Sequence, residues 1–414
     1  EDRRQKFAPF IIARVSEVVK HPNADRLRVC QVDIGQKDNI QVVCGAPNVK
    51  RGMVGVFAPV GAHIPGTDLL LKSGNIRGQS SNGMLCSKYE LELSNDHDGV
   101  IELDKTAPIG ASYAQWAGLD DPVIEIAITP NRGDCLGVYG IARDLAASGI
   151  GKLKKLDKTA YEGHFKSLVK WQISERAKLF CPFVSGRMFK IKENPASPEW
   201  MQNRLKAIGL RPISALVDIT NYLTFDLGRP LHVFDYDKLK GKILRMDLAK
   251  NVEKITALDG QEYQINSDEI VIYDVEKNQQ DRAVSIAGIM GGLDTGCDEQ
   301  TRHVFMEAAY FDPIITGKTG RRTGILSDAR YRFERGVDPQ SCIWGNDIAS
   351  RLIVEICGGE ASYMVKAGDV PTYNQAISLN PIKVKSYGGL DIKWQDASEK
   401  LQKLGFDVQQ ASAQ

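Results

Sequence analysis

Short apolar runs separated by turn residues fill the first part of the chain. The runs are Phe10–Val15, Leu27–Ile34, Ile40–Val43 and Val54–Phe57, and clusters of Gly, Pro and Asn such as Gly45–Asn48 stand between them. Runs of this length between turn signals predict β-strands. Many short strands at such spacing favour a small closed barrel over residues 1–118, for which the oligonucleotide-binding barrel is the natural candidate.

The pattern changes after this predicted barrel. The apolar run Val123–Ile128 predicts a strand, and the spacing of Ile141, Leu145 and Ile150 predicts a helix after it. From Gly151 to about residue 170 the chain is rich in Lys and has little periodicity, as linkers do. We therefore expect residues 119–175 to form a small α/β segment followed by a linker.

Strands and helices mix in the segment 176–372, which predicts an α+β domain. Phe183–Ile191 predicts a strand, and Ser197 followed by Pro198 predicts the start of a helix with Ser197 as its N-cap. The predicted buried stripe of this helix is Met201, Leu205 and Ile208. Further predicted strands are Lys242–Met246, Glu269–Tyr273, Val284–Ile286 and His303–Met306.

The last segment, residues 373–414, holds the beginning of another module. Asp396–Leu404 predicts a helix with Asp396 as its cap, and Phe406–Val408 predicts the start of a strand with little chain left to pair with. The chain begins at Glu1 instead of Met. We expect a piece of a longer protein that is cut at both ends.

Composition and charge narrow the class of protein. The 414 residues are 43% hydrophobic and 25% charged, with 53 Lys and Arg against 52 Asp and Glu. Such balance gives no global attraction to a polyanion, so any nucleic-acid binding must come from local patches. The eight cysteines never form a Cys-x-x-Cys pair, which argues against zinc ligation or a disulfide framework. With no apolar run of about 18 residues, we expect a cytoplasmic protein.

Polar residues gather in the α+β segment where the fold alone does not require them. Glu307 stands inside the otherwise apolar run Val304–Ala309, and His232 lies in a Pro-Leu-His-Val-Phe stretch. A carboxylate in an apolar strand is costly unless it has a partner, so Glu307 is either paired within the fold or placed to meet a ligand. His232 is by the same reasoning either a satisfied core histidine or part of a site.

Four segments resemble one family. They are Thr129–Asp144 (TPNRGDCLGVYGIARD), Val217–Tyr222 (VDITNY), Gly228–Asp235 (GRPLHVFD) and Asp328–Pro339 (DARYRFERGVDP). In this order they are similar to motifs of the β subunit of bacterial phenylalanyl-tRNA synthetase. The barrel motifs Val42–Asn48 and Gly83–Ser87 are similar to the tRNA-binding barrel of synthetase-associated proteins.

The resemblance implies an organisation and a function. Residues 1–118 would form the tRNA-binding barrel, 176–372 the editing domain, and 373–414 the incomplete start of a winged-helix-like domain. The complete enzyme would join phenylalanine to tRNA(Phe) with ATP and Mg²⁺ as an α₂β₂ assembly whose α subunit holds the synthetic site. This fragment would bind neither ATP nor a metal, and would hydrolyse tyrosine wrongly attached to tRNA(Phe).

The resemblance also implies the residues of an editing pocket. Glu307 would accept the tyrosine hydroxyl, while His232, Asn221 and Thr220 would lie near the ester. Gly291 would leave room for the ring, and Ser327 and Ala329 would form another wall. No general base can be assigned, and attack by a water molecule positioned by the substrate itself is an equally good mechanism.

A basic stretch follows the predicted strand with Glu307. Lys318, Arg321, Arg322 and Arg330 predict contacts to the phosphates of a tRNA acceptor end, although buried arginine–carboxylate pairing is the other interpretation. The sequence departs from the family at Thr323, where a histidine is usual, and at Arg330-Tyr331, where Ser-His is usual.

Two alternatives to an enzyme remain. One is a tRNA-binding or scaffolding protein whose pocket residues are structural. Residues 8–118 hold eleven Lys and Arg against eleven Asp and Glu, so the predicted barrel serves either packing or weak RNA contact. The other is a DNA-binding regulator, against which the balanced total charge argues.

Overall fold

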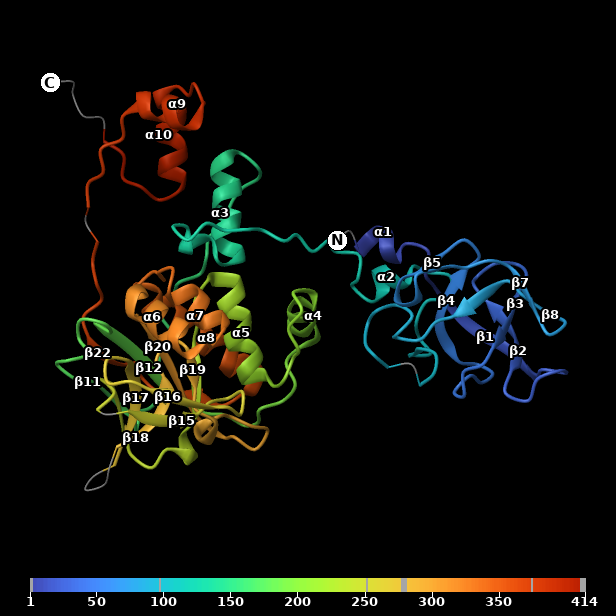
Figure 1. The fold of residues 1–414 in the computed structure, drawn as a ribbon, viewed down its shortest axis with the longest axis horizontal. Helices are drawn as coiled ribbons and strands as arrows, with labels where there is room; N and C mark the ends of the chain where they lie inside the picture. Colours follow the sequence, from blue (N-terminus) through green and yellow to red (C-terminus); the bar gives the residue numbers. More distant parts are fainter. Residues whose placement is uncertain (1–2, 97, 251, 277–280, 374, 410–414) are drawn as a thin grey trace. The chain divides into compact units, whose positions relative to one another are not determined.

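The computed structural model describes residues 3–96, 98–250, 252–276, 281–373 and 375–409. The chain forms two compact units, Glu1–Ile126 and Ala127–Gln414 (Figure 1). Among the described residues, no helix has both the length and the apolar character to cross a membrane. The domain limits expected from the sequence stay a prediction.

The smaller unit is a nearly closed barrel. Its sheet has the strand order β10-β4-β1-β2-β3, and β9 also pairs with β4. Strands β3 and β9, which the structure describes throughout, are not paired with each other as strands. A backbone hydrogen bond links the two edges, in which the amide of Asn82, just before β9, donates to the carbonyl of Gln41 in β3 over 2.9 Å. Strand β1 pairs with both β2 and β4, with a register shift between Val15 and Glu17 that bends it between its neighbours.

The elements of this unit are helices α1 (Arg3–Phe7) and α2 (Tyr113–Trp116), the 3-10 turn η1 (Pro65–Thr67), and strands β1 (Ile11–Lys20), β2 (Arg28–Asp33), β3 (Ile40–Cys44), β4 (Val54–Pro59), β5 (His63–Ile64), β6 (Leu69–Leu70), β7 (Gly74–Ile76), β8 (Gln79–Ser81), β9 (Gly83–Leu85) and β10 (Glu102–Leu103). Strands β1 to β4 confirm the four strands predicted from the apolar runs.

The strand predicted at Val123–Ile128 is wrong. These residues, all of which the structure describes, form no strand, and Ile124 and Ile126 are 74% and 47% exposed. An apolar run becomes a strand only where another strand pairs with it, and this run has no such neighbour. The helix predicted after it is present as α3 (Val138–Ser148), which Gly149 ends in the left-handed conformation, so Ile150 lies beyond it.

The larger unit is built on two five-stranded sheets. One has the order β13-β20-β12-β21 with β22 also on β12, and the other has the order β11-β14-β17-β18-β19. The strands of this unit are β11 (Lys170–Ile173), β12 (Phe183–Lys190), β13 (His232–Asp235), β14 (Ile243–Leu248), β15 (Glu253–Thr256), β16 (Glu262–Ile265), β17 (Ile270–Val275), β18 (Arg282–Ile286), β19 (Met290–Gly291), β20 (His303–Ala309), β21 (Glu360–Ala361) and β22 (Val365–Gly368). These include every strand predicted between 176 and 372.

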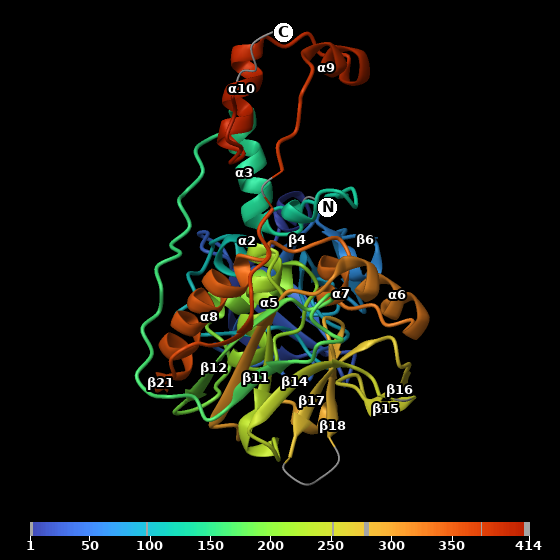
Figure 2. The same cartoon turned by 90° about the vertical axis from the view of Figure 1, so that its left-hand side faces the viewer.

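Alternating side chains of β20 face two different layers. Phe305 packs in a buried cluster with Leu244 and Ile272 of the other sheet, so the two sheets pack face to face. Val304 and Met306 point the opposite way, into a cluster with residues of α4, α5 and α8. Figures 1 and 2 show α5 to α8 gathered on one side of the strands. Strand β20 is therefore buried on both faces.

The helical elements of the larger unit, besides α3, are η2 (Gly133–Cys135), α4 (Glu199–Ala207), α5 (Ala215–Leu227), η3 (Tyr236–Lys238), η4 (Leu293–Thr295), α6 (Pro313–Thr323), α7 (Asp328–Phe333), α8 (Ser341–Cys357), α9 (Pro381–Gly388) and α10 (Trp394–Lys403).

Three details of the predicted helices need correction. Ser197 does not cap α4, because its hydroxyl donates to the buried carboxylate of Asp218 over 2.5 Å and Pro198 is the N-cap. Ile208 is 45% exposed, so it is not in the buried stripe. Helix α10 starts after Lys393, so Asp396 lies in its first turn. The run Phe406–Val408, which lies within the described residues, forms no strand.

A buried ion pair ties α8 to strand β12. Arg187 and Asp347 are each 3% exposed, with Nη2 and Oδ1 2.7 Å apart. Arg187 also donates to Asn346 and to the carbonyls of Ser362 and Tyr161. The Asp347 carboxylate also accepts from the backbone amide of Tyr161. The ion pair therefore holds the segment around Tyr161, which precedes strand β11, against α8 and β12.

Asp347→Ala should lower the free energy of unfolding of the larger unit by about 3–5 kcal/mol, since it leaves a buried guanidinium without its counter-charge. Urea unfolding followed by circular dichroism measures this. Glu360→Ala, which removes the partner of exposed Lys190, is the control and should cost less than about 1 kcal/mol. Equal effects of the two substitutions would contradict the role assigned to the buried pair.

Candidate active site

Strand pairing brings His232 and Glu307 together although 74 residues separate them in the chain. In the antiparallel pair of β13 and β20, His232 stands directly opposite Glu307. Directly opposed residues project from the same face of a sheet, a few ångström apart. On the other side of β20 the residue opposite Glu307 is Gly186, which has no side chain. Glu307 therefore stands between the His232 ring on one neighbouring strand and, over Gly186 on the other, the rings of Phe305 and Trp171.

This face looks into a cavity of about 360 Å³ between the two sheets. The cavity collects every residue that the sequence predicted for the editing pocket: Thr220, Asn221, His232, Gly291, Glu307, Ser327 and Ala329. They come from α5, β13, β19, β20 and the start of α7. Their assembly into one cavity is observed; what each of them does remains a prediction.

Gly291 is required by the His232 ring. A Cβ atom built on Gly291 would lie 2.3 Å from Cε1 of His232, far inside van der Waals contact. The neighbour that fills the space left by this glycine is therefore the histidine. Gly291 belongs to the opposite sheet, so this close approach also fixes the spacing of the two sheets at the cavity.

Burial dominates the electrostatics of Glu307. The side chain is 6% exposed, and loss of hydration raises the pKa of its carboxyl to about 7. The positive charge of Arg229 and the backbone amide of Ala309 oppose this rise. A carboxyl whose pKa is raised this far is able to take up a proton near neutral pH, so it can accept or donate a hydrogen bond according to the partner it meets.

His232 is held neutral. Burial lowers the pKa of its imidazole to about 4, and its ring meets Phe234 edge-on with centroids 4.4 Å apart. Nε2 is buried and has no hydrogen-bond partner among the residues that the structure describes. An unpartnered buried nitrogen that lines a cavity is available to a ligand or to water.

The hydroxyl groups of the cavity already have partners. Thr220 Oγ1 donates to the carbonyl of Val217 over 2.8 Å. Ser327 Oγ donates to the carbonyl of Ile289 over 2.6 Å and accepts from the amide of Arg330, so that it caps α7 and ties it to the glycine-rich turn. The side chain of Asn221 forms no hydrogen bond with any described residue. Of these three side chains, Asn221 is the one left to bind a ligand.

Sequence reasoning missed the counter-charge of the site. Arg229 is 1% exposed, and its Nη2 donates to the carbonyl of Ala309 over 2.5 Å, two residues from Glu307. Its Nη1 donates to Ser341 Oγ over 3.2 Å. The sequence offered one sign of this counter-charge, because Arg229 lies three residues before His232 in a largely apolar stretch. Phe311 and Phe333, which also line the cavity, carried no signal beyond their apolar character.

The predicted basic contacts separate into two groups. Lys318 and Arg321 are exposed on α6 and make no ion pair within the described part of the chain. Arg322 is exposed as well, but its guanidinium binds Glu269. Arg330 is buried, with Nε 3.0 Å from Glu334 and Nη1 2.5 Å from the carbonyl of Ile325. We therefore leave Arg322 and Arg330 out of the phosphate contacts proposed below.

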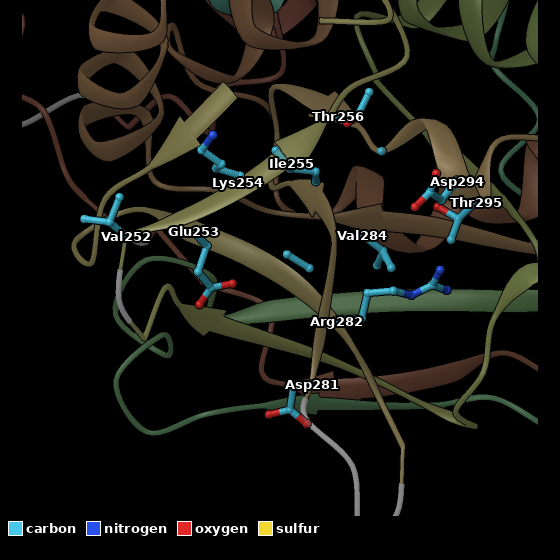
Figure 3. Close-up of a pocket in the computed structure, with 12 residues that line it drawn as sticks. Val252, Glu253, Lys254, Ile255, Thr256, Asp281, Arg282, Val284, Asp294 and Thr295 are labelled. Atoms are coloured by element: carbon cyan, nitrogen blue, oxygen red, sulfur yellow. The ribbon is translucent and has the colours of Figure 1, made fainter. Parts of the chain in front are cut away.

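A larger cavity, of about 450 Å³, lies on the other side of the Gly291–Gly292 wall. Figure 3 shows the guanidinium of Arg282 reaching toward the end that holds Asp294 and Thr295. The charges around it are already paired within the fold: Arg282 with Asp274, Lys254 with Glu262, and Asp281 with Arg245 and Lys250. Such pairing describes a polar surface crevice, so the smaller cavity remains the candidate site.

One group of side chains has the composition of a metal site. Ligand atoms of Asp134, Cys135 and Asp144 lie within 4.8 Å of one another. Arg132 and Arg143 bind both carboxylates, with Arg132 Nη2 2.6 Å from Asp144. A cation there would have to replace two guanidinium groups, and burial raises the pKa of the Cys135 thiol to about 11. We assign no metal to this cluster.

Two family descriptions match the chain. Residues 10–112 match a tRNA binding domain and residues 180–358 match the B3/4 domain. The first covers the barrel strands, and the second covers the His232–Glu307 cavity and most strands of the two sheets, from β12 to β20. The fold and the site thus define a chain that joins a tRNA-binding barrel to a B3/4 domain.

Relatives extend the match to nearly the whole chain. The chain is 50% identical to the phenylalanine–tRNA ligase β subunit of Brucella suis over 99% of its own length and 50% of that protein. It is 50% identical to that of Nitrobacter winogradskyi, over 98% of this chain and 50% of that protein. It is 48% identical to that of Gluconobacter oxydans, over 99% of this chain and 49% of that protein.

The chain spans about half the length of the curated relatives it matches. Over that span it belongs to the family of phenylalanine–tRNA ligase β subunits, which confirms the resemblance seen in its motifs. Among solved structures, an N-terminal fragment of the phenylalanyl-tRNA synthetase β subunit from Pyrococcus horikoshii is 16% identical and covers 69% of this chain and 77% of that one. Its TM-score of 0.31 is too low to support an inference.

The two buried groups predict opposite pH dependences of stability. The pKa of Glu307 rises from an ordinary 4.5 to about 7, so the folded protein keeps a proton that the unfolded chain releases, and stability falls as pH rises through this window. The pKa of His232 falls from 6.5 to about 4, so stability is lost as pH falls through that window.

Glu307→Gln should remove the loss of stability that accompanies deprotonation of Glu307 and leave the loss that accompanies protonation of His232. The unfolding free energy of the variant minus that of the unchanged protein should therefore increase between about pH 5 and about pH 7, by no more than about 3 kcal/mol. Urea unfolding at several pH values measures this difference. Glu299→Gln, which changes an exposed carboxyl, is the control. A difference that stays constant with pH would contradict the raised pKa.

Proposed function

We propose that this chain is part of a phenylalanine–tRNA ligase β subunit that binds tRNA and hydrolyses tyrosine wrongly esterified to tRNA(Phe). The observation that carries the proposal is a carboxyl group, Glu307, at the wall of an otherwise largely apolar cavity beside a neutral histidine. The family membership and the match to the B3/4 domain support it.

The chemistry of discrimination supports this substrate. A synthetic pocket shaped for phenylalanine rejects an analogue with one added hydroxyl only weakly, by about 10²-fold in comparable enzymes. A second pocket with a fixed acceptor reverses the preference, because tyrosine satisfies the acceptor and phenylalanine leaves it unpaired. Glu307 would be that acceptor, and Phe311 and Phe333 would contact the aromatic ring.

The same arrangement supports hydrolysis at the other end of the ligand. With the phenol at Glu307, the ester would lie toward Thr220 and Asn221 on α5. The free amide of Asn221 would hold the ribose or the attacking water. Water adds to the ester carbonyl, the bond to the ribose oxygen breaks, and tyrosine and the tRNA hydroxyl leave. The general base stays unassigned, and Nε2 of neutral His232 and a hydroxyl of the substrate are both able to orient the water.

Two surfaces would bind the tRNA. We infer that Lys318 and Arg321, exposed on α6 and without an ion-pair partner among the described residues, meet phosphates of the acceptor end. Arg322 is already bound to Glu269 and is left out with Arg330. The barrel would add an auxiliary contact, in keeping with its match to a tRNA binding domain and with its eleven basic against eleven acidic residues. The four-part division with limits near 118, 175 and 372, and a winged-helix-like module from 373, belongs to the same proposal.

The remaining functions would belong to the complete enzyme. Phenylalanine would be joined to tRNA(Phe) at a site in the α subunit, with ATP and Mg²⁺ held there and by no residue of this chain. The assembly would be an α₂β₂ heterotetramer. The other candidate function is a tRNA-binding or scaffolding role without catalysis, in which the cavity residues are structural.

A deacylation assay on the assembled enzyme tests the proposal. The unchanged enzyme should hydrolyse Tyr-tRNA(Phe) faster than Phe-tRNA(Phe), and Glu307→Ala should reduce this preference by about 10²-fold or more because the fixed acceptor is gone. Attachment of phenylalanine to tRNA(Phe) is the internal control and should not change. If both forms hydrolyse the two esters alike, the pocket assignment is wrong; if neither exceeds the rate in buffer, the scaffolding role is correct.

A further inference from the structure

A second recess opens beside the candidate active site, on the outer side of α7. It has a volume of about 350 Å³ and is lined by Leu326, Ser327, Asp328, Arg330, Tyr331 and Glu334. Ser327 and Asp328 also line the His232–Glu307 cavity. The two spaces therefore adjoin at the start of α7, with these two residues between them.

Helical periodicity explains why one short helix serves both spaces. Residues four apart lie on the same side of a helix. Ala329 and Phe333 line the cavity, while Ser327 and Tyr331 line the recess. The helix separates the two spaces, and its cap residue Ser327 stands where they join.

The recess carries a fixed aromatic ring. The guanidinium of Arg335 lies 3.6 Å from the ring centroid of Tyr331, and Arg335 is held in turn by Glu334 over 2.7 Å. One face of the ring is therefore covered by a stacked cation. Tyr331 is nevertheless 42% exposed, so its remaining surface is open to the recess. Leu326 at the rim is 89% exposed, which is unusual for leucine.

Charge selects the kind of ligand. The recess holds the carboxylates of Asp328 and Glu334, and its guanidinium, Arg330, is 3.0 Å from Glu334. A phosphate would meet these carboxylates without a free cation. A flat, uncharged group with polar edges fits better, because it can stack on Tyr331 while the half-exposed carboxylate of Asp328 accepts from its amino group.

We propose that this recess binds the base of the nucleotide whose ribose carries the ester. The proposal rests on the proposed function, which puts an aminoacyl ester in the adjoining cavity. The base is the next part of such a ligand beyond the ribose. Tyr331 and Leu326 hold it by stacking and apolar contact, which any base accepts. Tyr331 is thus a positioning residue that fixes the ester relative to Asn221 and His232.

Two inert analogues test the recess. One is adenosine with tyrosine joined to its 3′ position by an amide, which replaces the ester oxygen by N–H and resists hydrolysis; the other is the same tyrosyl amide on a ribose without a base. Both are used as inhibitors of Tyr-tRNA(Phe) deacylation by the assembled enzyme, so that only binding at the deacylating site is read. The base should improve inhibition of the unchanged enzyme on the order of 10-fold.

Variants of Tyr331 test whether this side chain causes the stronger inhibition by the analogue that carries a base. Tyr331→Ser should abolish the gain and raise KM for Tyr-tRNA(Phe) with a smaller change in kcat, whereas Tyr331→Phe should keep it. Tyr363→Ser, which removes another exposed tyrosine of the same unit, is the matched control. Analogues that inhibit the unchanged enzyme equally, or a gain that survives Tyr331→Ser, would overturn the proposal.

The outcomes separate the two proposals. If the unchanged enzyme does not hydrolyse Tyr-tRNA(Phe), the proposed function fails, and the recess with it. If hydrolysis is intact but the base adds nothing, the recess proposal alone is wrong. The comparison of analogues on the unchanged enzyme needs no variant to fold.

Discussion

A carboxyl group kept inside a strand that is buried on both faces is the constraint around which the larger unit is arranged. The neighbours of Glu307 on β20, from Val304 to Ala309, are all 0% exposed. Removing a carboxylate from water without a full set of partners costs free energy, and here the cost appears as a pKa raised to about 7. The sheet packed on one face of β20 and the helices packed on the other must provide that free energy, because apolar burial is the largest favourable contribution to folding.

The fold limits this cost without cancelling it. Arg229 approaches from the loop before β13 and is fixed by Ser341 and by the carbonyl of Ala309. Gly345 on α8 makes room for it, since a Cβ there would lie 2.9 Å from Cγ of Arg229. The guanidinium lowers the pKa of Glu307 but forms no hydrogen bond with it in the described structure. A direct ion pair with Arg229 would occupy the carboxylate oxygens of Glu307. Because Arg229 acts without such contact, these oxygens can interact with a ligand in the cavity.

The sequence predicted which residues line the cavity better than it predicted the local structure around it. Glu307 and His232 stand out because their chemistry conflicts with their apolar surroundings, and that conflict is visible in a sequence. The run Val123–Ile128 does not form a strand, because pairing depends on a neighbour that the run itself does not encode. Ser197 fails to cap α4 for a related reason: Asp218, 21 residues away, takes its hydroxyl.

The arginines illustrate the same limit. Counting them along residues 318–335 predicts a basic surface, yet α7 turns Arg330 and Arg332 inward, where they are 8% and 5% exposed. Arg330 binds Glu334 and Arg332 binds Asp328, each across one helical turn. A charge therefore counts toward a nucleic-acid surface only after its internal partners are known. In α7 those partners use the charges to hold the helix in place, and the two cations without an ion-pair partner among the described residues, Lys318 and Arg321, lie on α6.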